Sequence, residues 1–292
     1  CRLAGDNGCA QRHFEASLAI CHALGDQAGA GRALAHLSQV QLALNDWPAA
    51  EHSCRKAAAL FDILGQPDDL GLVHNNWGII CQEQEQLGDA LAHFEQAEAA
   101  FRAAGNLRGL AKTLVNQGDV YRRREEWDDT ARYIRAAIAL YQQIGDPLHS
   151  ASTQMNLSIL LFETGRPAEA LALSLEAEAV FRRLRHRPFL ARICNNHGMF
   201  LAALGRNAEA QEAFDESVRL HMENGDRLYA AHALCNCAEI LIDRGSSAAG
   251  RAYLAQARDL LDSLPERPQW LVREWEIQRA RLEDPAGAQP AS

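Results

Sequence analysis

Residues 105–145 read GNLRGLAKTLVNQGDVYRRREEWDDTARYIRAAIALYQQIG, and the pattern of this stretch recurs along the chain every 40 residues. The copies begin at Gly25, Gly65, Gly105, Gly145, Arg185 and Gly225, with no insertion between them. A fixed period of roughly 20–50 residues is typical of a solenoid, in which each unit buries its apolar face by stacking on its neighbours. The spacing therefore predicts an array of repeats rather than a domain with one central core.

Each copy contains two segments with helical character, such as residues 107–124 and 129–144. An aspartate before the first segment can accept hydrogen bonds from the free N–H groups of a helix start. The aspartates at this position are Asp26, Asp146 and Asp226. Glycine after the second segment permits the left-handed backbone that often ends a helix. Arg185 replaces this glycine in one copy, so we expect the turn there to be irregular.

Columns of small residues indicate where the two helices of a repeat approach each other closely. In the first helix this column holds Ser38, Gly78, Gly118, Ser158, Gly198 and Ala238. In the second helix one such column holds Ala57, Ala97, Ala137, Ala177, Ser217 and Ala257. Four residues later comes a mainly aromatic column, with Phe61, Phe101, Tyr141, Phe181, His221 and Leu261.

This order of small and aromatic columns resembles the tetratricopeptide (TPR) repeat, with a period of 40 instead of the usual 34. The longer variety is seen in kinesin light chains, in Leu-Gly-Asn-repeat polarity adaptors and in sensor regions of large bacterial regulators. The resemblance covers about residues 8–264 and implies an all-α fold, a right-handed α-solenoid of helix-turn-helix repeats. HEAT and armadillo repeats have similar lengths, but the paired small columns argue against them.

The predicted organisation is a truncated half repeat over residues 1–24, six full repeats, a capping helix over 265–283 and a disordered tail over 284–292. The six repeats are 25–64, 65–104, 105–144, 145–184, 185–224 and 225–264. The chain begins in the middle of a repeat and lacks an initiator Met, so we expect a longer protein that continues upstream. The exposed face of residues 9–24 could then pair with another copy.

Composition and motifs argue against several classes of function. The formal net charge is -9, which disfavours a nucleic-acid partner for this segment, and no apolar run is long enough to cross a membrane. The eight cysteines form no CxxC pair and are predicted to be buried thiols in a reducing cytoplasm. HExxH, GxSxG, P-loop and zinc-binding spacings are all absent from the sequence, so we expect no enzyme activity, no cofactor and no metal.

One column of the first helix is unusually polar: it holds His36, Asn76, Asn116, Asn156, Asn196 and Asn236. Five of the chain's twelve asparagines share this position, although Asn is a poor helix former. In the TPR family the first helices line the inner surface, so the column resembles an asparagine ladder that holds an extended peptide backbone. A carboxamide both donates and accepts hydrogen bonds, which suits a peptide unit of any sequence.

Neighbouring residues extend this candidate peptide-binding site. The second carboxamides Asn75 and Asn195 and the cations Arg32, Lys112, Arg192 and Arg123 belong to it. The structural alternative is that the asparagines bond to the adjacent repeat and only set the superhelix.

Two functional hypotheses follow. The first is a cytoplasmic scaffold that binds a protein or peptide ligand in the concave groove. The second is the ligand-sensing arm of a larger bacterial signal-transduction or transcriptional regulator, with an ATPase or effector domain upstream. A P-loop upstream would favour the regulator, whereas further repeats would favour the scaffold.

Overall fold

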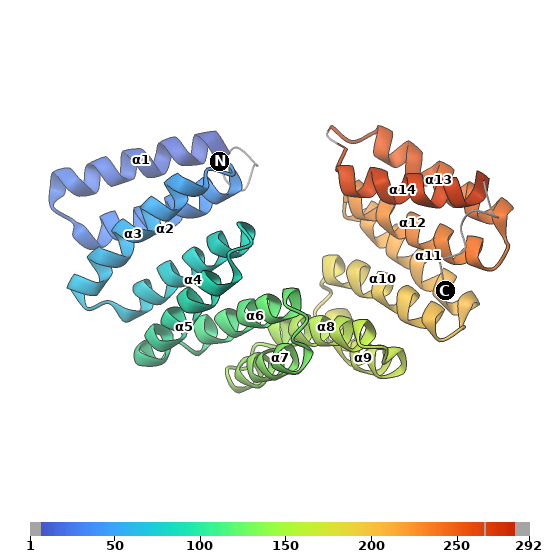
Figure 1. The fold of residues 1–292 in the computed structure, drawn as a ribbon, viewed down its shortest axis with the longest axis horizontal. Helices are drawn as coiled ribbons and strands as arrows, with labels where there is room; N and C mark the ends of the chain where they lie inside the picture. Colours follow the sequence, from blue (N-terminus) through green and yellow to red (C-terminus); the bar gives the residue numbers. More distant parts are fainter. Residues whose placement is uncertain (1–6, 266, 284–292) are drawn as a thin grey trace. The chain divides into compact units, whose positions relative to one another are not determined.

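The computed structural model describes residues 7–265 and 267–283, and every regular element in them is an α-helix (Figure 1). The prediction of an all-α fold is therefore confirmed. Residues 1–6 of the predicted half repeat and the whole predicted tail, 284–292, lie outside the described residues. Of the helices that the structure describes, none is both long and hydrophobic enough to span a lipid bilayer.

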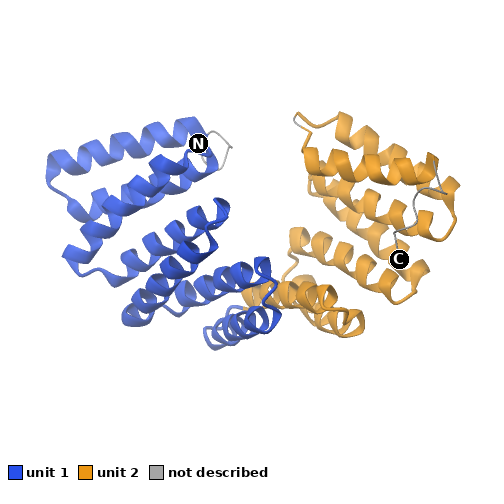
Figure 2. Cartoon of the chain, viewed as in Figure 1, with its two compact units in different colours: residues 1–146 blue, residues 147–292 orange. Residues whose placement is uncertain are grey.

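The chain divides into two compact units, residues 1–146 and 147–292 (Figure 2). The division falls between the third and fourth predicted repeats. Unit 1 contains α1 (Asn7–Leu24), α2 (Gln27–Ala43), α3 (Trp47–Leu64), α4 (Pro67–Glu83), α5 (Leu87–Ala104), α6 (Leu107–Arg123) and α7 (Trp127–Gln143). Unit 2 contains α8 (Pro147–Glu163), α9 (Pro167–Arg183), α10 (Arg187–Ala203), α11 (Asn207–Glu223), α12 (Arg227–Asp243), α13 (Ser247–Asp262) and α14 (Gln269–Glu283).

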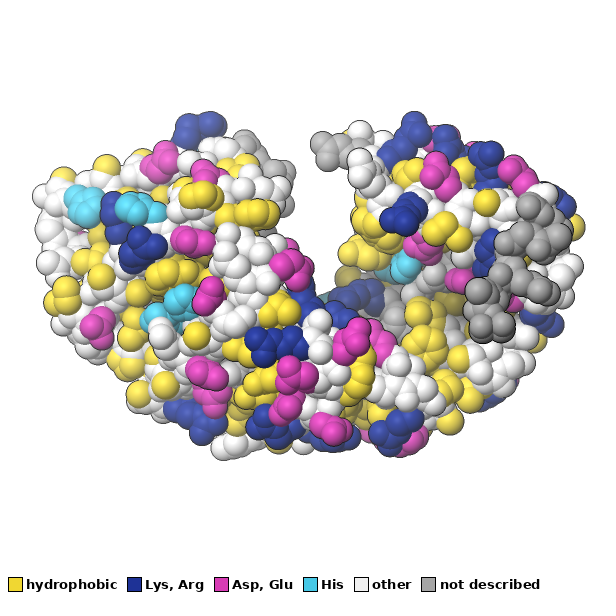
Figure 3. Space-filling model, in the orientation of Figure 1, with side chains coloured by type: hydrophobic (Ala, Val, Ile, Leu, Met, Phe, Trp, Pro, Cys, Tyr) yellow, Lys and Arg dark blue, Asp and Glu magenta, His cyan; other side chains and the backbone are white. Residues whose placement is uncertain are grey.

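Within each unit, the first helix of a repeat (the A helix) packs against the second (the B helix). A helices also contact each other: α2 with α4 and α4 with α6 in unit 1, and α8 with α10 and α10 with α12 in unit 2. Each unit therefore has one surface built from neighbouring A helices. On the face drawn in Figure 3, acidic and basic side chains are interspersed over both units.

The turns recur every 20 residues, because a residue with positive φ follows each helix from α1 to α12. Eight of these residues are glycines, and the others are Asn45, Glu85, Glu125 and Arg185. The expectation of an irregular turn at Arg185 is wrong: its φ is 52°, and the next N–H, that of His186, donates to Phe181 O at 3.0 Å. Gln66 donates to Phe61 O at 3.0 Å in the same way after Gly65. The helix-ending hydrogen bond thus fixes the turn even where Arg must adopt the left-handed backbone.

The predicted helix caps are only partly correct. The Asp26 carboxylate accepts a hydrogen bond from Gly29 N at 2.8 Å, as expected. Asp226 makes no such cap bond, and its carboxylate lies 3.5 Å from Nδ1 of His221 instead. Asn106 caps α6 by accepting from Gly109 N at 2.8 Å, which the sequence pattern did not single out.

The small column of the A helices is where B-helix side chains press against the backbone. A Cβ at Gly78 would lie 2.5 Å from the ring of Phe94, and one at Gly198 would lie 2.6 Å from Phe214. At Gly118 the nearest atom is Cγ1 of Ile134, at 3.2 Å. The facing B-helix column is fully buried: Ala57, Ala97, Ala137, Ala177, Ser217 and Ala257 are all 0% exposed. Close A–B packing, as predicted, forms the core of each repeat.

The end helices complete the units. In unit 2, α14 packs on α12 and α13 and buries Leu271, Trp275 and Leu282, and Trp275 Nε1 donates to Leu254 O at 2.8 Å. In unit 1, α1 packs on α2 but leaves Ile20 and Leu24 exposed. An exposed apolar face at the start of the described chain agrees with the sequence prediction.

The cysteine prediction holds for most of the described thiols. Cys54, Cys81, Cys194, Cys235 and Cys237 are free and buried, and Cys21 is free and half-buried. For Cys9 the prediction is wrong, because this residue is disulfide-bonded. Cys9 lies partly exposed in the first turn of α1, where repeat packing does not isolate its sulfur.

Substitution of Gly78 by Ala tests the packing of the small column. We expect Gly78→Ala to lower the free energy of unfolding by about 1–3 kcal/mol, because the new methyl group overlaps the Phe94 ring. Gly118→Ala should cost less, since its nearest neighbour is farther away. Gly88→Ala in α5 is the control: a Cβ there meets no atom within 4 Å, so stability should stay equal or rise slightly. Urea unfolding measures all three, and equal losses at Gly78 and Gly88 would contradict the packing argument.

Candidate functional site

The A helices of unit 2 present one polar stripe, which we call the ladder face. Positions four, seven and eleven residues apart lie on the same side of a helix. The ladder face consists of Ser152, Asn156, Ile159 and Glu163 on α8, Arg192, Asn196, Met199 and Ala203 on α10, and His232, Asn236, Glu239 and Asp243 on α12.

In unit 1, the asparagines of the ladder column bond to the preceding A helix. Asn76 is buried; its Nδ2 donates to Ala35 O at 3.3 Å, and its Oδ1 accepts from Gln39 Nε2 at 3.1 Å. Asn116 Nδ2 donates to Asn75 Oδ1 at 2.9 Å. These are the bonds expected if the asparagines only connect adjacent repeats and set the superhelix. Ligand binding by Asn76 and Asn116 stays a prediction.

In unit 2, the rungs differ from one another. Asn236 Nδ2 donates to Asn195 Oδ1 at 3.0 Å, which repeats the bond between Asn116 and Asn75. Within the described part of the chain, the side chains of Asn156 and Asn196 make no hydrogen bond, and both are partly exposed. The position 41 residues before Asn196 holds Met155, so the carboxamide pair seen at Asn116 and Asn236 cannot form there.

The four predicted cations have different surroundings. Arg123 lies 3.1 Å from Glu85, 3.4 Å from Glu83 and 3.4 Å from Asp119, so its guanidinium is already neutralised. Arg32 lies 3.6 Å from Asp69 in a looser pair. Lys112 and Arg192 are exposed and form no ion pair with any described residue. Lys112 and Arg192 thus have charges available for a ligand, and Arg32 is held only by its loose pair with Asp69.

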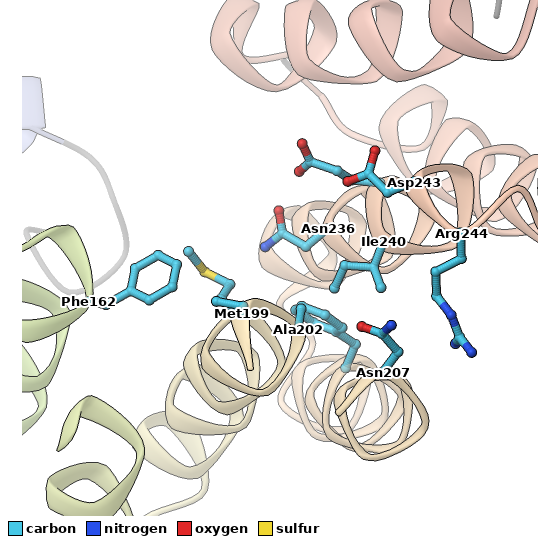
Figure 4. Close-up of a pocket in the computed structure, with 11 residues that line it drawn as sticks. Phe162, Met199, Ala202, Asn207, Asn236, Ile240, Asp243 and Arg244 are labelled. Carbon is cyan, nitrogen blue, oxygen red and sulfur yellow. The ribbon is translucent and has the colours of Figure 1, made fainter. Parts of the chain in front are cut away.

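A pocket of about 470 Å³ opens beside the ladder face of unit 2 (Figure 4). Phe162, Met199 and Ile240 supply apolar walls from α8, α10 and α12, and Asn236 adds a carboxamide. The acidic residues Glu239 and Asp243 and the cation Arg244 also line it. An apolar pocket with a few polar groups is the usual form of a site for a side chain or small ligand.

Helix α14 supplies charges that balance the acidic end of the ladder face. Arg281 pairs with Asp243 and, at 3.5 Å, with Glu239. Glu274 lies 3.6 Å from Nε2 of His232. Burial, and to a smaller extent the charge of Glu239, raises the pKa of Glu274 to about 7. Burial and the neighbouring His221 lower the pKa of His232, so this ring is neutral at pH 7.

Comparison with known proteins identifies the repeats. Residues 69–129 and 109–183 match the family model of the tetratricopeptide repeat. Residues 69–183 therefore consist of tetratricopeptide repeats. This match confirms the resemblance inferred from the small and aromatic columns.

Two curated relatives of this TPR protein are regulators. It is 28% identical over 160 residues to the regulatory protein AfsR of Streptomyces coelicolor, covering 53% of this chain and 16% of AfsR. AfsR of Streptomyces griseus is 28% identical over 204 residues, which cover 68% of this chain and 19% of that protein. The chain thus spans less than a fifth of the length of these relatives.

A solved structure shows the same fold. The signal transduction ATPase with numerous domains from Pyrococcus horikoshii, which has a tetratricopeptide repeat sensor, gives a TM-score of 0.67 at 14% identity. The alignment covers 89% of this chain and 38% of that one. At this identity the likeness concerns the fold alone.

The sequence pattern did not single out Phe162 and Ile240 of the pocket. Phe162 occupies a repeat position that changes in every copy: Leu42, Gln82, Arg122, Phe162, Ala202 and Ile242. Such variability between otherwise similar TPR copies is the signal that could have found it, because a packing position keeps one residue class.

Replacing Glu274 by Gln tests the buried carboxyl group in this TPR protein. The pKa of Glu274 in the folded state, about 7, lies above its ordinary value of 4.5, so its contribution is full below pH 4.5 and is lost as the pH rises through 7. We therefore expect Glu274→Gln to be more stable than wild type by about 1–3 kcal/mol at pH 8, with a much smaller difference at pH 5. Denaturant unfolding at both pH values measures this. Glu276→Gln, at an exposed position of the same helix, is the control, and an equal gain at pH 5 and pH 8 would contradict the expectation.

Proposed function

We propose that this TPR protein is a non-catalytic binding module that holds an extended peptide segment of a protein partner on the ladder face of unit 2. The observation that carries the proposal is the pair of partly exposed carboxamides, Asn156 and Asn196, which have no hydrogen-bond partner among the described residues. They lie on α8 and α10, two A helices in contact. Each can donate to a peptide C=O and accept from a peptide N–H.

The adjacent pocket adds side-chain selectivity to this backbone recognition. Phe162, Met199 and Ile240 form a surface for an apolar side chain. Met is a flexible and polarizable residue that adapts to different partners. The acidic Glu239 and Asp243 are balanced by Arg281, so they do not require a strongly basic ligand. The best ligand is therefore an extended segment with one apolar anchor residue.

Peptide display tests this function. Peptides of about 12 residues are selected on the 292-residue chain, and the Kd of the best one is measured by fluorescence anisotropy. Loss of two hydrogen bonds of about 1 kcal/mol each predicts that Asn156→Ala/Asn196→Ala binds about ten- to hundredfold more weakly. Met199→Glu should also weaken binding, because it places a charge in the apolar wall of the pocket.

The matched control is Asn76→Ala/Asn116→Ala in unit 1. These asparagines already bond to the preceding A helices, so the double variant should lose unfolding stability while it keeps the Kd for the selected peptide. Unchanged affinity in Asn156→Ala/Asn196→Ala, with the fold intact by circular dichroism, would overturn the proposal.

As a second candidate, we infer that the module is the sensor arm of a larger bacterial regulator. The similarity to less than a fifth of AfsR supports this inference. The sequence of the complete reading frame tests it: we expect a P-loop ATPase or effector region upstream. A reading frame that contains only further repeats would contradict the sensor-arm candidate, and only the proposal of a binding module would then stand.

A further inference from the structure

A second pocket, of about 250 Å³, lies in unit 1 between the N-terminal halves of α4 and α6. Its apolar lining comes from Leu72 and from Phe101 of α5. Gly109 also lines it, and a Cβ there would lie 2.6 Å from the Phe101 ring, so glycine leaves room for this ring, which is 5% exposed. The volume is below the roughly 300–1,000 Å³ of sites for drug-sized molecules, so it suits one small ligand.

The wall of this pocket contains a buried donor without an acceptor. Asn75 is 1% exposed and lines the pocket. Its Oδ1 accepts two hydrogen bonds, from Asn116 Nδ2 at 2.9 Å and from Thr113 Oγ1 at 3.1 Å, which together orient the carboxamide. Its Nδ2 has no hydrogen-bond partner in the part of the chain that the structure describes. A buried unpaired donor costs about 1–3 kcal/mol, and such groups are normally paired with protein, water or a ligand.

Two charges of opposite sign at the pocket are available to a ligand. Arg108 is paired with Asp146 at 2.8 Å, and so its charge is neutralised. Lys112 on α6 forms no ion pair with any described residue. Asp69 on α4 is held only by the loose pair with Arg32, at 3.6 Å, and the Arg32 side chain is 53% exposed. Asp68 on α4 also lines the pocket, and its carboxylate accepts a hydrogen bond from Asn106 Nδ2. Lys112 and the two carboxylates Asp68 and Asp69 therefore face the pocket from two different helices.

We propose that this pocket binds a free amino acid with an apolar side chain. The ligand carboxylate accepts hydrogen bonds from Asn75 Nδ2 and the Lys112 ammonium group, and its own ammonium group pairs with Asp69. Its side chain packs on Leu72 and Phe101. The site lies in unit 1 and does not depend on peptide binding by unit 2.

The equivalent position in unit 2 provides a matched comparison. Asn195 accepts a hydrogen bond from Asn236 at 3.0 Å, as Asn75 does from Asn116. Asn195 Nδ2, however, lies 3.8 Å from the Met199 sulfur, and Asn195 lines neither the 250 Å³ pocket nor the pocket beside the ladder face. Asn195→Asp therefore keeps the acceptor between helices without touching the proposed site.

Isothermal titration calorimetry on the 292-residue chain tests the proposal with L-leucine, L-phenylalanine and L-methionine as probes. We expect at least one of them to bind with one-to-one stoichiometry. N-acetyl-leucine, leucinamide and the tripeptide Gly-Gly-Leu should bind at least tenfold more weakly than leucine, because each lacks one charge next to the side chain. Asn75→Asp removes the donor but keeps the acceptor, so it should abolish binding, whereas Asn195→Asp should bind as wild type does.

Lys112→Met is a second variant at an exposed position that does not affect the core, and it should weaken binding at least tenfold. Circular dichroism verifies that each variant is folded. Three results would overturn the proposal: no heat with any of the amino acids at millimolar concentration, unchanged binding by both Asn75→Asp and Lys112→Met, or binding of Gly-Gly-Leu as tight as that of leucine. The last result would assign the pocket to the carboxyl end of a peptide.

Discussion

The close approach of A-helix backbones to large B-helix side chains is the constraint on which both units depend. At Gly78 and Gly198 a phenylalanine ring occupies the space where any other residue would place its Cβ. A repeat built this way buries its B-helix side chains against a partner helix and leaves the opposite side of the A helix free. This other side of the A helices is the surface on which we propose that a ligand binds.

The asparagine column shows that residues alike in sequence can differ in their hydrogen bonds. Asn116 donates to Asn75 and Asn236 donates to Asn195, whereas Asn76 donates to the backbone oxygen of Ala35. Among the described residues, Asn156 and Asn196 have no hydrogen-bond partner. Under the proposed function, the bonded asparagines contribute to stability and the unbonded ones bind the ligand.

Charge is balanced locally within each unit. Arg123 gathers three carboxylates around itself in unit 1, and Arg281 neutralises the acidic end of the ladder face in unit 2. Most ionic groups are therefore satisfied by the repeats themselves. Lys112 and Arg192, which form no ion pair with any described residue, are exceptions. Such groups suit the proposed ligand recognition, because their interaction with a ligand does not first require an internal pair to break.

By itself, the sequence determined the repeat period, the helix pairs and the small columns, because these depend on the size of residues and on their spacing along the chain. Two local predictions from the sequence were wrong. The turn at Arg185 is regular, because the helix-ending hydrogen bond forms there as in the other repeats. Asp226 does not cap its helix, because its carboxylate lies beside His221. It identified the Asn column, and only the tertiary structure decided which carboxamides are paired. The two pockets were also decided there, because their walls combine residues from three or four helices whose side chains meet only after the repeats stack.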